Sequence, residues 1–75
     1  MRKLTSWDEF VKVTSRLGYT ALKPGNRGGS GMPFLAPDGV TQRNFHKPHN
    51  GVELRIKTMS RRLGISVQEF QELAQ

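Results

Sequence analysis

The chain has 75 residues, no cysteine and a formal net charge of +6 at neutral pH. This length allows one domain with one small core, and the lack of cysteine excludes disulfides and thiolate metal sites. Two histidines and scattered carboxylates do not make a pattern of metal ligands, and no apolar run is long enough to span a bilayer. We therefore expect a single cytoplasmic domain over residues 1–75, with no cofactor, no metal and no membrane contact.

The first predicted element is a helix over residues 7–17. Ser6 and Glu9 have the spacing of a capping box, in which a hydroxyl and a carboxylate satisfy free amides at a helix start. Gly18 is typical of a helix end, because glycine adopts positive φ without strain. The apolar residues between these ends fall on one helical stripe: Trp7, Phe10, Val11 and Leu17.

Three strands are predicted to follow, over residues 19–23, 32–36 and 40–47. Residues 24–30 are rich in glycine and predict a loop between the first two strands. Pro33 cannot donate a backbone hydrogen bond, so the second strand is expected at an edge of the sheet. The segment Pro37-Asp38-Gly39 has the residues of a tight turn and predicts a hairpin between the second and third strands.

Two further helices are predicted after the strands. The first spans residues 55–63, and Gly64 ends it. Ser66 and Glu69 form a second capping box and begin a last helix that runs toward Gln75. The predicted order is α-β-β-β-α-α, which indicates an α+β domain with a three-stranded antiparallel sheet packed on helices.

Positive charge is concentrated in the middle of the chain. Residues 16–62 contain nine lysines and arginines against two carboxylates, a net charge of +7, whereas residues 63–75 have two glutamates and no basic residue. Four of the cations share the predicted helix at 55–63: Arg55, Lys57, Arg61 and Arg62. Concentrated positive charge attracts phosphate backbones, so nucleic acid is the expected partner. A solvated helix face or an acidic protein partner would also account for the charge.

Three segments and their order carry a family resemblance. They are GGSGMPFLAPDG at 28–39, NFHKPHNGVEL at 44–54 and RRLGISVQEFQEL at 61–73. Together with the predicted order of elements, they resemble the HicA toxins, small ribonucleases of bacterial toxin–antitoxin pairs. The resemblance implies a fold like that of the double-stranded-RNA-binding domain and a toxin that cleaves mRNA. It also implies a HicB-like antitoxin as the partner that holds the toxin inactive.

The chain departs from this family at the catalytic position. The family's loop has glycine, serine and then a catalytic histidine, whereas Gly29 and Ser30 are followed here by Gly31. The stretch between Leu54 and Gly64 is also about one helical turn shorter than in the family. An inactive module that binds RNA or a partner without cutting is therefore an alternative to a ribonuclease.

RNA cleavage by the adjacent 2′-hydroxyl needs a base near that hydroxyl and an acid near the leaving oxygen, and it needs no metal if side chains supply both. Histidine suits both roles because it titrates near neutrality. His46 and His49 are the two histidines in the chain and hence the catalytic candidates.

The hairpin register decides where His46 lies. A two-residue type I′ turn at Asp38-Gly39 would place Gly31 opposite His46 and put Phe34 and Phe45 on one face. A three-residue turn with Gly39 in a bulge would put the two aromatics on opposite faces. We favour the first register because the aromatics are then buried together.

Phosphate contacts are expected from the glycine-rich loop and from the basic helix. Successive backbone amides of the loop can form an anion-binding nest, or the loop is a plain connection between strands. In a fold of this kind, double-stranded RNA is recognised by shape and backbone. The predicted RNA-binding residues are Arg27, Gly29, Ser30, Gly31, Lys47, Arg55, Arg61 and Arg62.

A helix-turn-helix DNA-binding regulator is a further alternative, since Gly64 lies in a turn between two predicted helices. Its recognition helix would carry Glu69 and Glu72 and no basic residue. DNA phosphates would repel such a helix, so RNA is the favoured partner.

Overall fold

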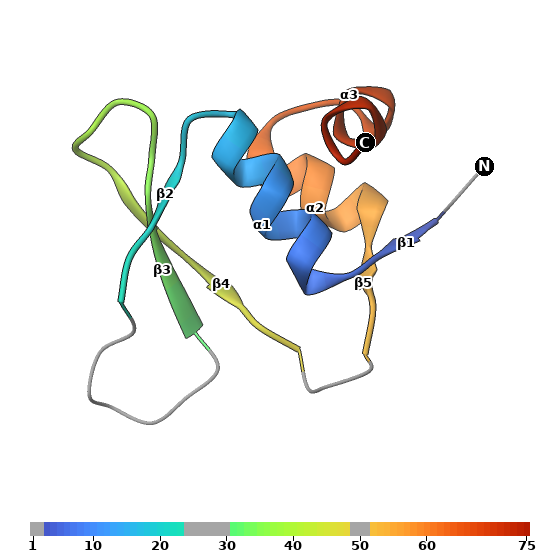
Figure 1. Cartoon of the computed structure of the whole chain (residues 1–75), viewed down its shortest axis with the longest axis horizontal. Coiled ribbons are helices and arrows are strands. Elements are labelled where there is room, and N and C mark those ends of the chain that lie inside the picture. The colour runs from blue at the N-terminus through green and yellow to red at the C-terminus, as the bar shows by residue number, and fades with distance from the viewer. Residues whose placement is uncertain (1–2, 24–30, 49–51) are drawn as a thin grey trace.

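The computed structural model describes residues 3–23, 31–48 and 52–75. Over these residues the chain forms three helices and five short strands, and the strands make two antiparallel sheets (Figure 1). The bounds in chain order are β1 Leu4–Thr5, α1 Trp7–Arg16, β2 Thr20–Ala21, β3 Gly31–Leu35, β4 Gln42–His46, β5 Leu54–Arg55, α2 Ile56–Leu63 and α3 Val67–Leu73. The predicted α+β class is confirmed, and so is the three-stranded antiparallel sheet.

The predicted helix ends are confirmed by their hydrogen bonds. The Ser6 hydroxyl accepts from the Glu9 amide at 3.2 Å at the start of α1, and the Ser66 hydroxyl accepts from the Glu69 amide at 3.0 Å at the start of α3. Gly18 follows α1 with a φ of 100°, and Gly64 ends α2 with a φ of 74°. These ends depend on local residues, which is why the sequence predicts them well.

The edge position expected for Pro33 is wrong, because β3 is the central strand in the order β2-β3-β4. The carbonyl oxygen of Pro33 accepts from the Leu22 amide at 3.0 Å. In an antiparallel pair the N–H and C=O of one residue point to the same neighbouring strand, so the hydrogen bond that Pro33 cannot donate is one to the Leu22 carbonyl. The strand pairing of β2 with β3 ends at Ala21 opposite Phe34, so Pro33 lies opposite Leu22, the first residue after β2. The proline is tolerated because it lies where the short strand β2 ends.

The core lies between the helices and one face of the three-stranded sheet. Phe10 of α1 meets Phe34 of β3 and Phe45 of β4, with ring centroids 6.2 and 5.0 Å apart. These three rings are at most 2% exposed. The remaining buried apolar residues are Val13, Ile56, Met59, Phe70 and Ala74. Helix α3 covers this cluster with Phe70, and the Arg16 guanidinium at the end of α1 donates to the Leu73 carbonyl at 2.8 Å.

A second, two-stranded sheet was not predicted. β1 pairs with β5, with Leu4 opposite Arg55 and Thr5 opposite Leu54. The Ile56 amide also donates to the Lys3 carbonyl at 3.0 Å, so the first described residues are tied to the start of α2. Figure 1 shows this pair of strands on the right, with the three-stranded sheet on the left. A two-residue strand has no hydrophobic periodicity, so nothing local indicates it.

Candidate nucleic-acid interface

The hairpin between β3 and β4 places Gly31 directly opposite His46. The Ala36 amide donates to the Thr41 carbonyl at 2.8 Å, so residues 36 and 41 form a hydrogen-bonded pair. Pairs alternate along an antiparallel ladder, which makes Gly31 and His46 a non-hydrogen-bonded pair with Cα atoms about 4.5 Å apart. The register that we favoured from the sequence is confirmed.

The turn that sets this register differs from the predicted type I′ turn. A type I′ turn needs positive φ at both Asp38 and Gly39. Gly39 has a positive φ of 76°, but Asp38 does not have a positive φ. The connection is a four-residue loop at 37–40, in which the Gly39 amide donates to the Ala36 carbonyl at 3.0 Å. A four-residue loop and a two-residue turn keep the same pairing of strands, so the register survives the wrong turn type.

Asp38 holds this loop through its carboxylate. One oxygen accepts from the amides of Val40 and Thr41, both at 2.8 Å, and the other accepts from the Thr41 hydroxyl at 2.6 Å. The hydrogen bond from the Thr41 hydroxyl, followed by those from the two amides, lowers the pKa of Asp38 below its ordinary value of 3.8. The charged form of Asp38 therefore supports the hairpin geometry on which the Gly31–His46 pair depends.

Gly31 and His46 lie on the sheet face that is turned away from the core. Phe34 and Phe45 occupy the other face, and side chains alternate between faces along a strand. Both Gly31 and His46 are exposed. Among the described residues, and apart from its chain neighbours, no atom lies within 4 Å of the position that a Cβ at Gly31 would take, so the described part of this face leaves room for a larger side chain beside His46.

Helix α2 is docked against the free edge of β4 through Arg62. Its Nη2 donates to the Asn44 carbonyl at 3.3 Å, and its guanidinium carbon lies 5.0 Å from the centre of the Phe45 ring. Asn44 belongs to a non-hydrogen-bonded pair with Pro33, so its carbonyl points to the outer edge of the sheet. This contact brings the last turn of α2 to the edge of β4 at Asn44, two positions before His46 in the chain.

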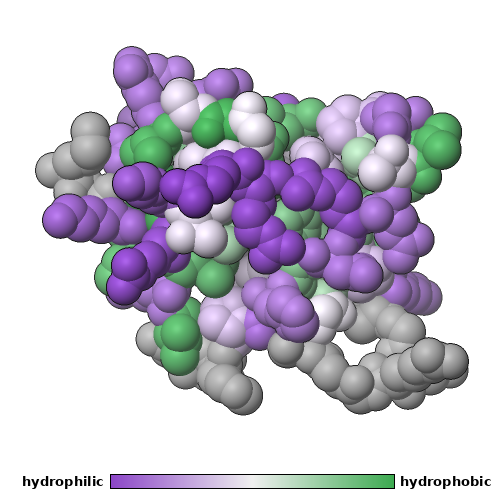
Figure 2. Space-filling view, turned by 180° about the vertical axis from the view of Figure 1, so that it is seen from behind, coloured by the Kyte–Doolittle hydropathy of each residue, from purple (hydrophilic) through white to green (hydrophobic). Residues whose placement is uncertain are grey.

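Exposed cations cover the outer side of α2. Arg55, Lys57, Arg61 and Arg62 are all exposed, and the helix itself contains no acidic residue. Figure 2 views the molecule from behind and shows strongly hydrophilic side chains in a broad band across the middle of that face. We call Arg55, Lys57, Arg61 and Arg62, together with the edge of β4 at Asn44, the α2–β4 face. The His46 side chain belongs to the sheet face that is turned away from the core.

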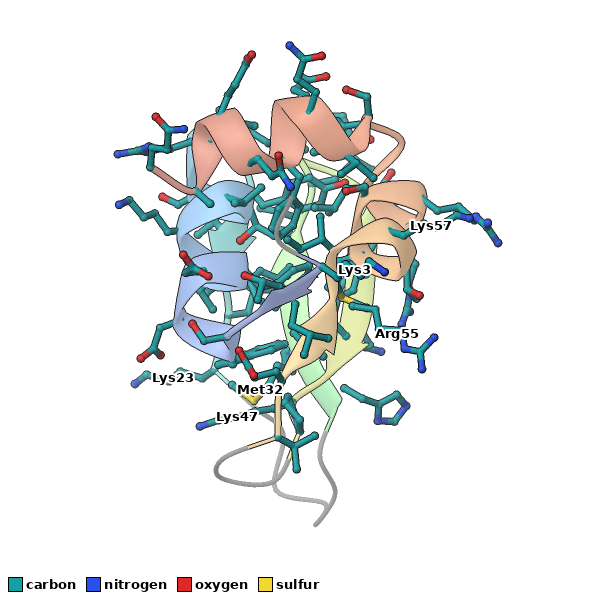
Figure 3. The ribbon with its side chains drawn as sticks, turned by 90° about the vertical axis from the view of Figure 1, so that its right-hand side faces the viewer. Lys3, Lys23, Met32, Lys47, Arg55 and Lys57 are labelled. Carbon is teal, nitrogen blue, oxygen red and sulfur yellow. The ribbon has the colours of Figure 1, made fainter. Side chains whose placement is uncertain are left out.

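The predicted site residues divide into three groups. Arg55, Arg61 and Arg62 lie on the α2–β4 face, whereas Gly31 and His46 lie opposite each other on the sheet face that is turned away from the core. Lys47 does not join them, because Figure 3 shows its side chain on the opposite side of the view from Arg55 and Lys57. Arg27, Gly29, Ser30 and His49 lie outside the described residues.

Two basic residues near this face escaped the sequence prediction. Arg43 lies on the core-facing side of β4, with its guanidinium carbon 5.1 Å from the Phe45 ring centre and Nη1 donating to the Tyr19 hydroxyl at 3.2 Å. Lys3 comes to the start of α2 through the pairing of β1 with β5. For Arg43, the spacing of an arginine two residues before an aromatic residue on a strand is a weak signal of their contact. For Lys3, no local sequence signal indicates that it lies beside α2.

The last helix does not offer a surface for DNA. Gln68, Glu69 and Glu72 are its exposed polar residues, and α3 contains no lysine or arginine. The charge argument against a helix-turn-helix regulator therefore applies to the folded chain as well.

No family model matches the chain, and searches of curated proteins and of solved structures also find no match. Among the described residues, no helix is both long and apolar enough to cross a membrane. The fold and the α2–β4 face define a small α+β domain with a basic helix docked on the edge of an antiparallel sheet.

Proposed function

We propose that this protein binds RNA through the α2–β4 face and acts as a HicA-like toxin, paired with a HicB-like antitoxin. The observation that carries the proposal is the contact of Arg62 with Asn44. It brings the last turn of α2, which contains Arg61 and Arg62, to the edge of the strand that carries His46. A phosphate backbone lying along α2 would meet several cations at once, and β4, whose Asn44 carbonyl accepts from Arg62, also carries His46.

RNA fits this face better than duplex DNA. The cations lie along a helix flank and a sheet edge, which suits backbone contacts rather than insertion of a helix into the major groove. The helix that would have to enter that groove, α3, is acidic. The proposed likeness to a double-stranded-RNA-binding domain rests on the three-stranded antiparallel sheet with helices on one face, together with the sequence resemblance to the HicA toxins.

In the proposed cleavage step, His46 takes the proton of an RNA 2′-hydroxyl. The 2′-oxygen attacks the adjacent phosphorus, the bond from phosphorus to the 5′-oxygen breaks, and that oxygen leaves with a proton from water. Arg61 or Arg62 stabilises the charge that develops on the phosphate oxygens. The nucleophile belongs to the RNA and the base is a side chain, so this step uses no metal.

Binding and cleavage are tested separately. Binding of a fluorescent RNA hairpin is measured by anisotropy over a range of salt concentrations. Arg61→Glu should weaken binding about ten-fold or more and flatten the salt dependence. Lys12→Glu makes the same charge change on α1 and should have a much smaller effect. Equal effects of the two substitutions, or tight sequence-specific binding of duplex DNA, would contradict the RNA-binding proposal.

Cleavage is measured on the same RNA with a chelator present. The unsubstituted protein should cut, and His46→Ala should bind RNA with similar affinity but cut at least about a hundred-fold more slowly. Binding without any cleavage would show that the protein is an inactive module. That result would leave the RNA-binding proposal intact.

A further inference from the structure

A hollow of about 730 Å³ opens beside the first turn of α2. Its walls come from three parts of the chain: the segment that includes β1, the start of α2 and the start of α3. Figure 3 shows Lys3, Arg55 and Lys57 gathered around the start of α2, on the side away from Lys47 and Lys23. The pairing of β1 with β5 brings these walls together, so the hollow is a product of the tertiary structure.

The hollow combines cationic and aliphatic walls. Lys3, Arg55 and Lys57 supply three positive charges, and all three are exposed. The aliphatic lining consists of Leu4 and the half-buried Val67, with Ile56 beneath them as a core residue that is only 1% exposed. Leu4 remains 41% exposed although it is a large apolar side chain. Apolar surface left open within a charged surround is typical of a binding site.

These walls suit a peptide better than a nucleotide. Nucleic-acid bases stack on aromatic rings or guanidinium planes. Arg55 offers one guanidinium, but the hollow has no aromatic lining residue and its apolar part is aliphatic. A small inorganic anion would use the cations but would leave the aliphatic surface open. A peptide with carboxylates on both sides of one large apolar residue satisfies the cations and covers the aliphatic surface together.

We propose that this hollow docks an acidic segment of a partner protein. One large apolar side chain of the segment enters between Leu4 and Val67, and neighbouring carboxylates meet Lys3, Arg55 and Lys57. The proposal does not require RNA binding. A docked segment would, however, neutralise Arg55 and Lys57, which also belong to the α2–β4 face. Such a partner would therefore oppose RNA binding there.

The probe is a short fluorescein-labelled peptide with one leucine between aspartates, and its binding is measured by anisotropy. The peptide should bind saturably, and replacing its leucine by serine should weaken binding about ten-fold, because the leucine loses its burial. Lys57→Glu should weaken binding about five-fold or more. Lys12 is an exposed lysine of α1 that does not line the hollow. Lys12→Glu should therefore change peptide binding by less than about two-fold.

The aliphatic wall is tested with Leu4→Ser against Val40→Ser, which removes an apolar side chain that is 83% exposed on the hairpin loop. Of the two variants, only Leu4→Ser should weaken binding of the leucine peptide. Leu4→Ser should have no effect on binding of the peptide in which the leucine is replaced by serine. Amide shifts in a two-dimensional NMR titration should centre on Leu4, Val67 and Thr58, which also lines the hollow. The same spectra establish that each variant is folded.

Three outcomes would overturn the proposal: equal binding of the leucine and serine peptides, equal effects of Lys57→Glu and Lys12→Glu, or amide shifts elsewhere. If an RNA oligonucleotide and not the peptide shifts Leu4 and Val67, the hollow belongs to the RNA surface instead. Arg61→Glu separates the two proposals, since it should reduce RNA binding about ten-fold while leaving peptide binding nearly unchanged.

Discussion

His46 on β4 lies directly opposite Gly31 on β3, on the sheet face that is turned away from the core. The two residues form a non-hydrogen-bonded pair, the closer of the two kinds of antiparallel pair. Within the part of the chain that the structure describes, no atom outside its chain neighbours lies within 4 Å of the position that a Cβ of residue 31 would take. The proposed resemblance to the HicA toxins would place a catalytic histidine at residue 31.

Gly31→His should raise RNA cleavage. The new ring would stand beside His46, and a base and an acid together should accelerate the reaction by about a hundred-fold over His46 alone. The substitution should not disturb the fold, because the site is open and glycine is a poor strand residue. Cleavage of labelled RNA with a chelator present gives the rate.

Gly31→Ala is the matched control for this experiment. It should fold and should cut RNA at the rate of the unsubstituted protein, because it adds a Cβ without a titratable group. If a folded Gly31→His variant cuts RNA no faster than Gly31→Ala, the proposal that cleavage takes place at the Gly31–His46 pair is wrong.

Arg62→Ala should lower the free energy of unfolding by about 1 kcal/mol, through loss of the hydrogen bond to the Asn44 carbonyl and of the contact with the Phe45 ring. Arg61→Ala removes the same charge from the next position and should change stability by no more than about 0.5 kcal/mol. Urea denaturation measures both. Similar losses from the two variants would show that Arg62 does not hold α2 on β4.

Asp38→Asn should make the stability of the protein less dependent on pH. The pKa of Asp38 is lowered by its hydrogen bonds, so the charged carboxylate stabilises the fold at neutral pH. That contribution is lost as pH falls from the ordinary value of 3.8 through the lower pKa of the folded state. The melting temperature of the unsubstituted protein should exceed that of Asp38→Asn at neutral pH, and the difference should shrink below pH 3.8. A difference that stays constant with pH would contradict this role.

Gly18→Ala should be destabilising by about 1–2 kcal/mol. Gly18 has a φ of 100°, and an added Cβ would lie 3.2 Å from the Cβ of Pro37 in the hairpin loop. Gly64→Ala provides the comparison, because Gly64 also has positive φ but open space around its Cβ position. Chemical denaturation should therefore show a larger loss for Gly18→Ala. Equal losses would mean that backbone strain alone matters and that the close approach to Pro37 does not.

Local interactions allowed much of the secondary structure to be predicted. The starts of α1 and α3 depend on a serine and a glutamate three residues apart, and the ends of α1 and α2 depend on single glycines. The hairpin register followed from burying Phe34 and Phe45 on one face, a constraint strong enough to give the right pairing with the wrong turn. Each of these features is determined by residues that are close in sequence or by one shared hydrophobic face.

The arrangement of the candidate site was beyond such reasoning. Lys47 follows His46 in the chain yet lies away from Arg55 and Lys57 in Figure 3. Pro33 was expected at an edge, but the central position of β3 depends on β2, whose two paired residues give almost no sequence signal.

The sequence by itself determined the α+β class, the helix ends, the pairing of Gly31 with His46 and the excess of positive charge on the segment that becomes α2. Only the tertiary structure decided that Arg62 would dock α2 on the free edge of β4, and that β1 would pair with β5 to form the hollow around Lys3. The reason is physical. Caps, turns and strand alternation act over a few residues, whereas these two contacts join segments far apart in the chain and form only when the whole core is buried.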